Sequence, residues 1–509
     1  MNTLLIALLV SQNMFAKTYG GIYLDEAHSI VQTIDGGYAI IGFTSSYGPG
    51  PQYYILVKLA PTGDVSWTKV IPVEPNPSFG NTPFLIQTAD GGYAIAGSTI
   101  SSVFGGSAIV IKLTSTGDME WAKTYDQDGT EYGLVNQRIA QTADGGYVVH
   151  GMVWGFGSDG WAYSLAKLNS SGDVQWAWLY DAPQHDNGEG GFCQTQNGSY
   201  VMVGYSRAFG LNWDAFVIKV DNLGTWQWAR AYGGVNTDKG VQIVQTTDLG
   251  YLIAGTTSSY GAGNSDLMII KIDNSGDLIQ WARAIGGSGD DRSVGLAKLA
   301  DGGFLVTGYT QSAGGGQDIL LLKIDDAGNL LWTKTLGGAD TEVVWGLTPT
   351  TDGGFAIVGM TKSYGAGGGD LFVLKTDANG NYTGCLADWS PQVMEVTPSV
   401  TVATQSLINY TPRVTSSNPA LTAPSPTVND VCQPLDVEEG YGFRPKITCS
   451  PIPAGALFFS PDAIGITIYK ADGRLAYSRE LNKGENRIKL ETGVYLWKAG
   501  TYKGKAIVR

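Results

Sequence analysis

The sequence has few charged residues, few histidines and few cysteines. Asp, Glu, Lys and Arg make up 15% of the 509 residues, against ~25% in an average soluble domain, so long solvated helices are not expected. The three histidines and four cysteines show no spacing typical of a metal site. No apolar run approaches the ~20 residues of a membrane-spanning helix, so no integral membrane span is predicted.

Positive charge is also scarce, and it is unevenly distributed. The formal net charge of −14 argues against nucleic acid as a partner, because binding phosphates requires basic side chains. Residues 436–509 nevertheless hold twelve basic and eight acidic residues, a net charge of +4, which leaves −18 for residues 1–435. Two parts of opposite sign indicate two domains with separate roles.

Glycine and aromatic residues are abundant, and they recur at fixed intervals. Glycine accounts for 71 residues and aromatics for 11% of the chain. The motif Asp-Gly-Gly-Tyr/Phe or a degenerate form of it occurs seven times, at intervals of 51 to 55 residues. The first residues of these motifs are Asp35, Asp90, Asp144, Asn197, Asp248, Asp301 and Asp352. Repetition of this kind indicates a tandem array of one structural unit.

Two further markers follow each motif. A lysine recurs in all seven units, as Lys58, Lys112, Lys167, Lys219, Lys271, Lys323 and Lys375. A tryptophan recurs in six units, as Trp67, Trp121, Trp176, Trp228, Trp281 and Trp332. Burial of a tryptophan ring removes roughly 150–250 Å² from water, so we interpret these six as packing residues.

Each unit reads as four short strands. In the sixth unit, apolar residues at 294–299, 304–310, 319–324 and 330–336 are separated by turns rich in Gly, Asp and Asn. Four-stranded units of about 50 residues in tandem are typical of a β-propeller, and seven units predict seven blades. A solenoid is the alternative, although it would need a cap at each end.

The two ends of the array favour a closed ring. The seventh unit lacks its tryptophan strand, since the pattern stops after Tyr382. The stretch Phe15-Ala16-Lys17-Thr18-Tyr19 near the N-terminus resembles that missing strand, as seen in Trp121-Ala122-Lys123-Thr124-Tyr125. We therefore predict that the N-terminal strand completes the last blade, which also removes open sheet edges.

The segments outside the repeats have other compositions. Residues 1–13 contain the short apolar stretch 4–10 and are expected to be a signal peptide, which places the protein outside the cell. The propeller is expected to span 14–384, and a Pro/Ser/Thr-rich connector with some strand pairing 385–435. A disulfide between Cys385 and Cys432 would close that connector, whereas Cys193 and Cys449 have no evident partner.

Residues 436–509 are expected to form a small β-sandwich of about seven strands. Five short motifs in this part are Cys449-Ser450-Pro451-Ile452-Pro453, Tyr469 to Arg474, Gly484-Glu485-Asn486, Gly493-Val494-Tyr495 and Lys505-Ala506-Ile507-Val508-Arg509. Together they resemble the C-terminal sorting domain of the type IX (Por) secretion system, with Ile452 where that family usually has Asn. The seven units likewise resemble the "DGGY" repeats of secreted bacterial and archaeal proteins. These resemblances imply export across an outer membrane and either removal of the tail or its use as a surface anchor.

Recurring carboxylates are one set of candidate binding residues. Asp25, Asp238, Asp291 and Glu342 each precede their motif by ten residues, at the start of the first strand. Asp214, Asp266, Asp318 and Asp370 recur every 52 residues at the start of the third strand, on the same face of the disc. They could ring a cation or a glycan. The alternative, which strict repetition favours, is that each carboxylate accepts hydrogen bonds from its own glycine loop.

Aromatic residues that break the repeat are the other set. Trp154 and Trp161 flank the loop between the second and third strands of unit three, and Trp213 ends the corresponding loop of unit four. If a glycan or a protein partner binds, we expect it on this face, stacked on these rings.

The function predicted from these features is non-enzymatic and needs no cofactor. A secreted or cell-surface propeller would serve adhesion, recognition or extracellular assembly, and could associate with itself or with a cell-surface glycan or protein. The alternatives are a lectin-like glycan-binding module, or a polysaccharide hydrolase or lyase. An enzyme of that kind would need an asymmetric acid pair or an arginine cluster in the central funnel.

Overall fold

The structure is a computed structural model that consists of strands and turns. It describes residues 13–48, 51–73, 82–99, 107–126, 134–154, 161–181, 186–208, 212–313, 316–338, 340–365, 368–382, 387–388, 392–396, 399–403, 406–409, 413–417, 427–430, 448–452, 455–460, 464–470, 475–481, 484–489, 493–499 and 502–508. Within these residues there is no helix, and so none long and apolar enough to cross a membrane. Two compact units are present, Met1–Cys432 and Gln433–Arg509.

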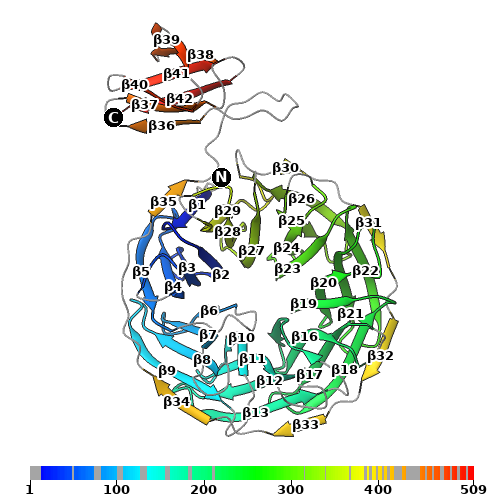
Figure 1. Ribbon diagram of the computed structural model, residues 1–509. Helices are drawn as coiled ribbons and strands as arrows, with labels where there is room; N and C mark the ends of the chain where they lie inside the picture. The colour runs from blue at the N-terminus through cyan, green and yellow to red at the C-terminus, as the bar shows by residue number, and fades with distance from the viewer. Residues whose placement is uncertain are drawn as a thin grey trace, which may run out of the picture. The chain divides into compact units, whose positions relative to one another are not determined.

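The first unit is a seven-bladed β-propeller, which confirms the predicted fold (Figure 1). Blade 1 is made of β2 (Asp25–Gln32), β3 (Tyr38–Thr44), β4 (Tyr53–Leu59) and β5 (Val65–Ile71). Blade 2 is made of β6 (Phe84–Gln87), β7 (Tyr93–Thr99), β8 (Ser107–Leu113) and β9 (Met119–Asp126). Blade 3 is made of β10 (Leu134–Gln141), β11 (Tyr147–Trp154), β12 (Trp161–Leu168) and β13 (Val174–Asp181).

The remaining blades repeat this arrangement around the ring. Blade 4 contains β14 (Asp186–Asn187), β15 (Phe192–Gln194), β16 (Tyr200–Ser206), β17 (Asp214–Val220) and β18 (Trp226–Gly233). Blade 5 contains β19 (Asp238–Gln245), β20 (Tyr251–Thr257), β21 (Asp266–Ile272) and β22 (Ile279–Gly286). Blade 6 contains β23 (Asp291–Lys298), β24 (Phe304–Thr310), β25 (Asp318–Ile324) and β26 (Leu330–Leu336), and blade 7 contains β27 (Glu342–Pro349), β28 (Phe355–Thr361) and β29 (Asp370–Thr376).

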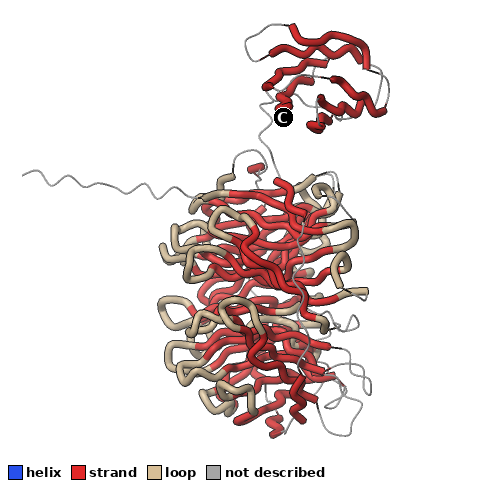
Figure 2. Tube along the Cα trace, turned by 90° about the vertical axis from the view of Figure 1, so that its left-hand side faces the viewer, coloured by secondary structure: helices blue, strands red, loops and turns tan. Residues whose placement is uncertain are grey.

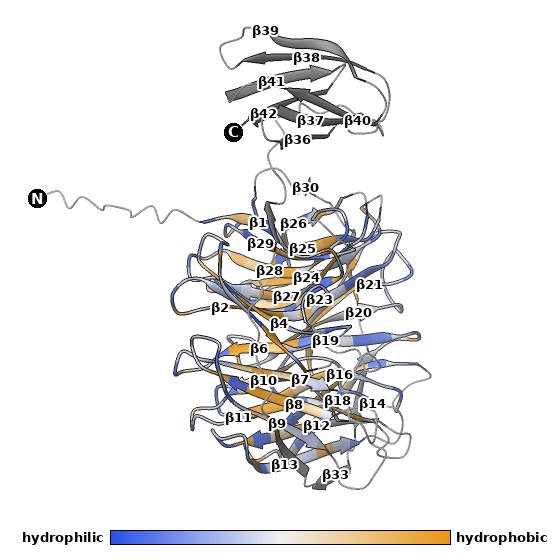
Figure 3. Cartoon of the chain, turned by 60° about the vertical axis from the view of Figure 1, so that its left-hand side comes forward, coloured by the Kyte–Doolittle hydropathy of each residue, from blue (hydrophilic) through white to orange (hydrophobic). Residues whose placement is uncertain are grey.

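The two middle strands of each blade are almost wholly buried, because each blade packs between two others. All seven residues of β4, β17, β21, β25 and β29 are buried. Figure 3 shows the same pattern, with hydrophobic residues along the strands and hydrophilic residues in many of the connections. Seen from the side in Figure 2, the strands lie stacked between two layers of loops and turns.

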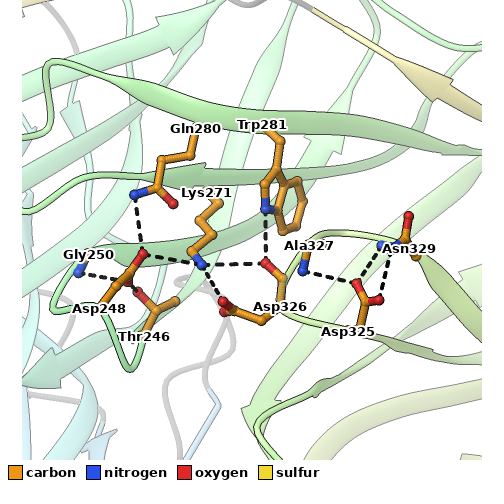
Figure 4. Close-up of polar contacts among 10 residues, drawn as sticks. All are labelled: Thr246, Asp248, Gly250, Lys271, Gln280, Trp281, Asp325, Asp326, Ala327 and Asn329. Carbon is orange, nitrogen blue, oxygen red and sulfur yellow. Dashed lines mark hydrogen bonds and ion pairs between the residues drawn. The ribbon is translucent and has the colours of Figure 1, made fainter.

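The recurring lysine neutralises the recurring turn aspartate within its own blade. In blade 5, Lys271 Nζ lies 3.3 Å from Asp248 Oδ2 and 2.8 Å from Asp326 Oδ2 of the next blade (Figure 4). The Asp248 carboxylate also accepts hydrogen bonds from Thr246 and from the Gly250 amide, so it holds the turn closed. Each of the seven lysines is buried to at least nine-tenths, and a buried ammonium group requires such a partner.

Blade 4 departs from this rule because Asn197 replaces the aspartate. Lys219 Nζ instead donates to Asn274 Oδ1 of blade 5 at 2.7 Å. Burial lowers the pKa of Lys219, in keeping with a lysine that lacks a carboxylate partner in its own blade.

The recurring tryptophans join one blade to the next, as the packing interpretation predicted. Trp67 packs edge-on against Tyr93 with 6.0 Å between ring centroids, and Trp121 packs in the same way against Tyr147. In each pair, the second ring is the aromatic residue of the next blade's motif. Edge-to-face pairs of this kind contribute about 0.5–1.5 kcal/mol beyond the area that they bury.

The N-terminal strand closes the ring as predicted. β1 (Phe15–Gly20) pairs antiparallel with β29, with Phe15 opposite Lys375 and Tyr19 opposite Leu371. Phe15 takes the place of the missing tryptophan, because its ring lies 5.7 Å from that of Tyr38 in blade 1. The first and last units of the array are thereby joined without a covalent link.

The segment expected to be a connector pairs with the outside of the ring, so the strand pairing predicted for it is extensive. Six short strands add a further strand to blades 6, 5, 4, 3, 2 and 7, in that order. They are β30 (Ala387–Asp388), β31 (Gln392–Glu395), β32 (Ser399–Ala403), β33 (Ser406–Asn409), β34 (Arg413–Ser417) and β35 (Thr427–Asp430), which we call the belt. Figure 1 shows them along the rim, and β35 pairs with β1.

The second unit has the seven strands expected of the tail. One sheet has the order β36-β37-β40, from β36 (Thr448–Ile452), β37 (Gly455–Ser460) and β40 (Gly484–Lys489). The other has the order β39-β38-β41-β42, from β38 (Ile464–Lys470), β39 (Leu475–Leu481), β41 (Gly493–Ala499) and β42 (Tyr502–Val508).

We predict that Asp301→Asn lowers the thermal unfolding midpoint. Lys323 Nζ lies 2.6 Å from Asp301 Oδ2 and would lose its carboxylate partner. Because the Asp301 side chain is half exposed, the expected loss is about 1–2 kcal/mol, below the range for a fully buried pair, or a few degrees by calorimetry. Asn197→Asp is the matched opposite change and is expected to raise the midpoint. An unchanged midpoint for Asp301→Asn would contradict this role of the pair.

Candidate functional site

The carboxylates that begin the first strands hold their own loops in place. Asp25 accepts hydrogen bonds from the Gly21 amide at 2.8 Å, from Thr44 Oγ1 at 2.6 Å and from Ser46 Oγ at 2.7 Å. Glu342 accepts from the Gly338 amide at 2.7 Å and from Thr361 at 2.8 Å. The loop-stabilising alternative therefore describes Asp25 and Glu342 well, since both of their oxygens accept hydrogen bonds from the scaffold.

The aspartates that begin the third strands lie at the junctions between blades. A methyl group built on Gly233 would overlap Asp214 Oδ1 and would lie 3.1 Å from Asp238 Oδ2. On Gly286, it would overlap Asp266 Oδ1 and lie 2.8 Å from Asp291 Oδ2. One carboxylate from each of two blades thus converges on a glycine that has no side chain to exclude them.

Convergence of two buried acids disfavours their ionisation. Burial raises the pKa of Asp214 to about 6, and the charge of Asp238 adds to this effect. Burial also raises the pKa of Asp318 to about 6, with a further contribution from Glu342. Burial raises the pKa of Asp266 as well. These acids are between 1% and 9% exposed, as is Asp370 at 1%, so a large ligand has little access to them.

The described residues contain no cluster of three or more His, Cys, Asp or Glu side chains that could hold a metal ion. The cation alternative for the recurring acids therefore gains no support from the described part of the chain. Cys193 carries a free thiol whose pKa burial raises to about 12, so it is not a reactive thiolate. Cys385 and Cys432 lie outside the described residues.

Departures from the repeat gather at the centre of the ring. The first strand of several blades contains a β-bulge, which shifts the register at His28, Val241, Val294 and Trp345. These four residues line a central cavity of ≈ 330 Å³, together with Arg138 and Glu189. A bulge leaves one residue outside the ladder, so its side chain can differ from blade to blade.

A groove on the loop face adjoins this cavity. It consists of two cavities of ≈ 370 and ≈ 270 Å³ that share Tyr205 and Lys239. The larger one also contains Glu189, Arg292 and Tyr309, and the smaller one Trp161, Asp186, Asn187, Arg207 and Trp213. Because Glu189 also lines the central cavity, the groove continues from that cavity over blades 3 and 4. We call it the loop-face groove.

Tyr205 lies at the middle of the loop-face groove. Its hydroxyl donates a hydrogen bond to Glu189 Oε2 at 2.9 Å. Its ring packs edge-on against that of Trp213, with 5.0 Å between the ring centroids. Burial and the Glu189 charge raise its pKa well above the usual value for a phenol. Burial lowers the pKa of Lys239, and the nearby Glu189 opposes that shift.

The structure brings two of the predicted site residues together at one cavity. Trp161 and Trp213, from adjacent blades, line the same cavity and are half-buried. The backbone of Trp154 pairs with that of Trp161 at the mouth of the same loop, and its side chain lies outside the described residues. The four aspartates Asp214, Asp266, Asp318 and Asp370 do not line the cavities described above.

Sequence reasoning missed Tyr205, Lys239 and Glu189, and it did not single out Arg207 or Arg292 among the available arginines. One signal was present, because Lys239 and Arg292 directly follow the first-strand acids Asp238 and Asp291. Units one and seven have Glu26 and Val343 at that place. A change of charge at an otherwise regular position is the kind of departure that marks a site.

Comparisons with known proteins give little about the chemistry. No protein-family model matches the sequence. The regulatory protein FlaEY of Caulobacter vibrioides is 32% identical over 162 residues, which are 28% of this chain and 16% of that protein. The chain thus covers about a sixth of that relative's length.

Several solved structures are similar in fold at low identity. They include a protein of unknown function from Dyadobacter fermentans (11% identity, TM-score 0.41, covering 70% of this chain and 98% of that one). An α-L-arabinanase of Penicillium chrysogenum complexed with arabinobiose has 11% identity and a TM-score of 0.39, and the match covers 71% of this chain and 98% of that one. A PL25 ulvan lyase has 9% identity and a TM-score of 0.44, and the match covers 72% of this chain and 96% of that one. Likenesses of this size carry no argument about activity.

We predict that Asp318→Asn raises the melting temperature at pH 7 but not at pH 4. A raised pKa means that ionisation of Asp318 costs stability as the pH rises from about 4 to about 6, by on the order of 1 kcal/mol. The neutral amide avoids this cost, and below pH 4 the wild-type acid is neutral as well.

Asp144→Asn provides the control of opposite sign. Hydrogen bonds from Thr142 and Lys167 lower the pKa of Asp144 to about 2, so its contribution to stability is present above about pH 4 and is lost toward pH 2. This variant should melt below the wild type at pH 7 and converge with it near pH 2. Parallel curves for Asp318→Asn and the wild type across pH 4–7 would refute the assignment.

Proposed function

We propose that the propeller recognises a polysaccharide, which lies along the loop-face groove. The observation that carries this proposal is the gathering of Trp161, Trp213 and Tyr205 from blades 3 and 4 at one cavity. Aromatic faces bind the apolar C–H faces of sugars, and the few polar groups beside them fix the orientation. Asn187, Arg207 and Lys239 supply such groups here.

The lining of the loop-face groove favours binding over hydrolysis. Glycoside hydrolysis by the usual mechanism requires two accessible carboxyl groups that flank the scissile bond. The described lining of the groove holds Glu189 and Asp186, and Asp186 has no exposed surface. Glu189 is engaged by the Tyr205 hydroxyl. Tyr205 itself is a poor general base at neutral pH, because its pKa is raised.

We further propose that this recognition takes place outside the cell or at its surface. Support comes from the apolar stretch at residues 4–10 and from the sorting-like motifs between Cys449 and Arg509. Adhesion and extracellular assembly remain compatible roles for a polysaccharide-binding disc. Self-association of the chain stays a prediction.

The proposal is tested by binding of the full chain to a panel of soluble polysaccharides, by retardation in native gels followed by calorimetry. We expect at least one polymer to bind, and the double variant Trp161→Ala, Trp213→Ala to weaken its binding tenfold or more. Loss of stacking on two rings removes roughly 1–3 kcal/mol or more.

Trp226→Ala is the matched control, because Trp226 is 36% exposed in β18 but does not line the loop-face groove. It should bind like the wild type. Equal binding by the double variant would overturn the proposal. Release of new chain ends during incubation would replace it with an enzymatic function.

A further inference from the structure

Three basic side chains in the loop-face groove lie over aromatic rings. Arg207 Cζ is 4.7 Å from the ring centroid of Trp213, and Lys239 Nζ is 4.5 Å from that of Tyr205. Arg292 Cζ is 6.0 Å from the ring centroid of Tyr309. The three cations come from blades 4, 5 and 6, so they follow the groove from one blade to the next.

These cations differ from other basic side chains of the propeller in their acidic partners. On the outer strands, Lys17, Lys123 and Arg230 form ion pairs of 2.6–2.9 Å with aspartates of the next blade. Among the described residues, neither Arg207 nor Lys239 forms an ion pair with an acidic side chain. Arg292 has a partner at the longer distance of 3.6 Å, in Asp290, and its side chain is 49% exposed.

The lining of the loop-face groove carries a local excess of positive charge. The chain as a whole carries −14, whereas the groove lining has three cations against the engaged Glu189 and the fully buried Asp186. A concave site with low-dielectric walls strengthens the potential of the charges that line it. Burial of Lys239, which lowers its pKa, is the kind of cost that a bound anion would offset.

We propose that the polysaccharide recognised by the loop-face groove is acidic, with a carboxylate or sulfate group presented to Arg207, Lys239 and Arg292. This inference rests on the proposed function. Guanidinium groups bind planar or tetrahedral oxyanions through two parallel hydrogen bonds, and such charge-assisted bonds are about twice as strong as neutral ones. Trp161, which lines the same cavity, would contact the sugar carbons, a contact that a small inorganic anion cannot make.

The test compares polymers that differ only in charge, in 0.15 M salt, where screening limits repulsion by the acidic remainder of the propeller. One pair is polygalacturonate and its methyl-esterified form, and the other is a sulfated galactan and its desulfated form. We expect at least one anionic polymer to bind tenfold or more tightly than its neutral counterpart. The first pair reports on carboxylate recognition and the second on sulfate recognition.

Variants then assign the charge preference to the three side chains. Arg207→Gln, Lys239→Gln and Arg292→Gln, each checked for an unchanged melting temperature, should weaken anionic binding about five- to tenfold and neutral binding by a clearly smaller factor. Arg283→Gln is the matched control, because Arg283 lies 5.5 Å from the ring centroid of Trp281 in β22, outside the groove. It should have no effect on either polymer.

The outcomes separate this inference from the function on which it rests. Equal binding of charged and neutral polymers that still depends on Trp161 and Trp213 would overturn the acidic class and leave polysaccharide recognition standing. A triple Gln variant that binds the anionic polymer like the wild type would overturn it as well. Binding of single-stranded nucleic acid in preference to every polysaccharide, or binding of no polymer, would overturn both proposals.

Discussion

The packing of each tryptophan against the motif aromatic of the next blade is the interaction on which the ring depends. The lysine–aspartate pair closes the turn within a blade, and the turn in turn positions the Tyr or Phe that receives the tryptophan of the preceding blade. Trp67 with Tyr93 shows this in the middle of the array. Phe15 with Tyr38 shows it at the closure. One ion pair within the blade and one ring contact between blades, each present at six of the seven positions, therefore link the units into the ring.

A ring built in this way leaves few positions free for function. The recurring acids illustrate the constraint, since Asp25 and Glu342 are saturated by hydrogen bonds from their own loops. The free positions are those that the contacts repeated from blade to blade do not use. They are the bulge of the first strand, the residue after the first-strand acid, and the ends of the loops between the second and third strands. The central cavity and the loop-face groove are lined largely from these positions.

This division explains which features could be predicted from the sequence. Blade number, ring closure and the packing role of Trp67 and its equivalents follow from repetition, because scaffold contacts must recur in every unit. Trp161 and Trp213 were identifiable because large aromatics interrupted a regular loop. Tyr205, Lys239 and Glu189 were not, since they meet only when two adjacent blades are folded side by side. The recurring aspartates were candidates for a ligand site, but their strict repetition already favoured a role in the scaffold.

The belt could be predicted only as extended chain with some pairing, because a strand that adds to an outer edge needs no apolar alternation of its own. Its position changes the physics of closure. β1 pairs with β29 on one side and with β35 on the other, so the strand that closes the ring is an interior strand of its sheet. Complete release of β1 therefore requires the loss of two ladders together with the Phe15–Tyr38 contact. The belt also covers the outer strands of six blades with backbone partners, which protects edges that would otherwise be available for aggregation. A closure without a covalent link is thus stabilised by a segment that follows the whole array in the sequence.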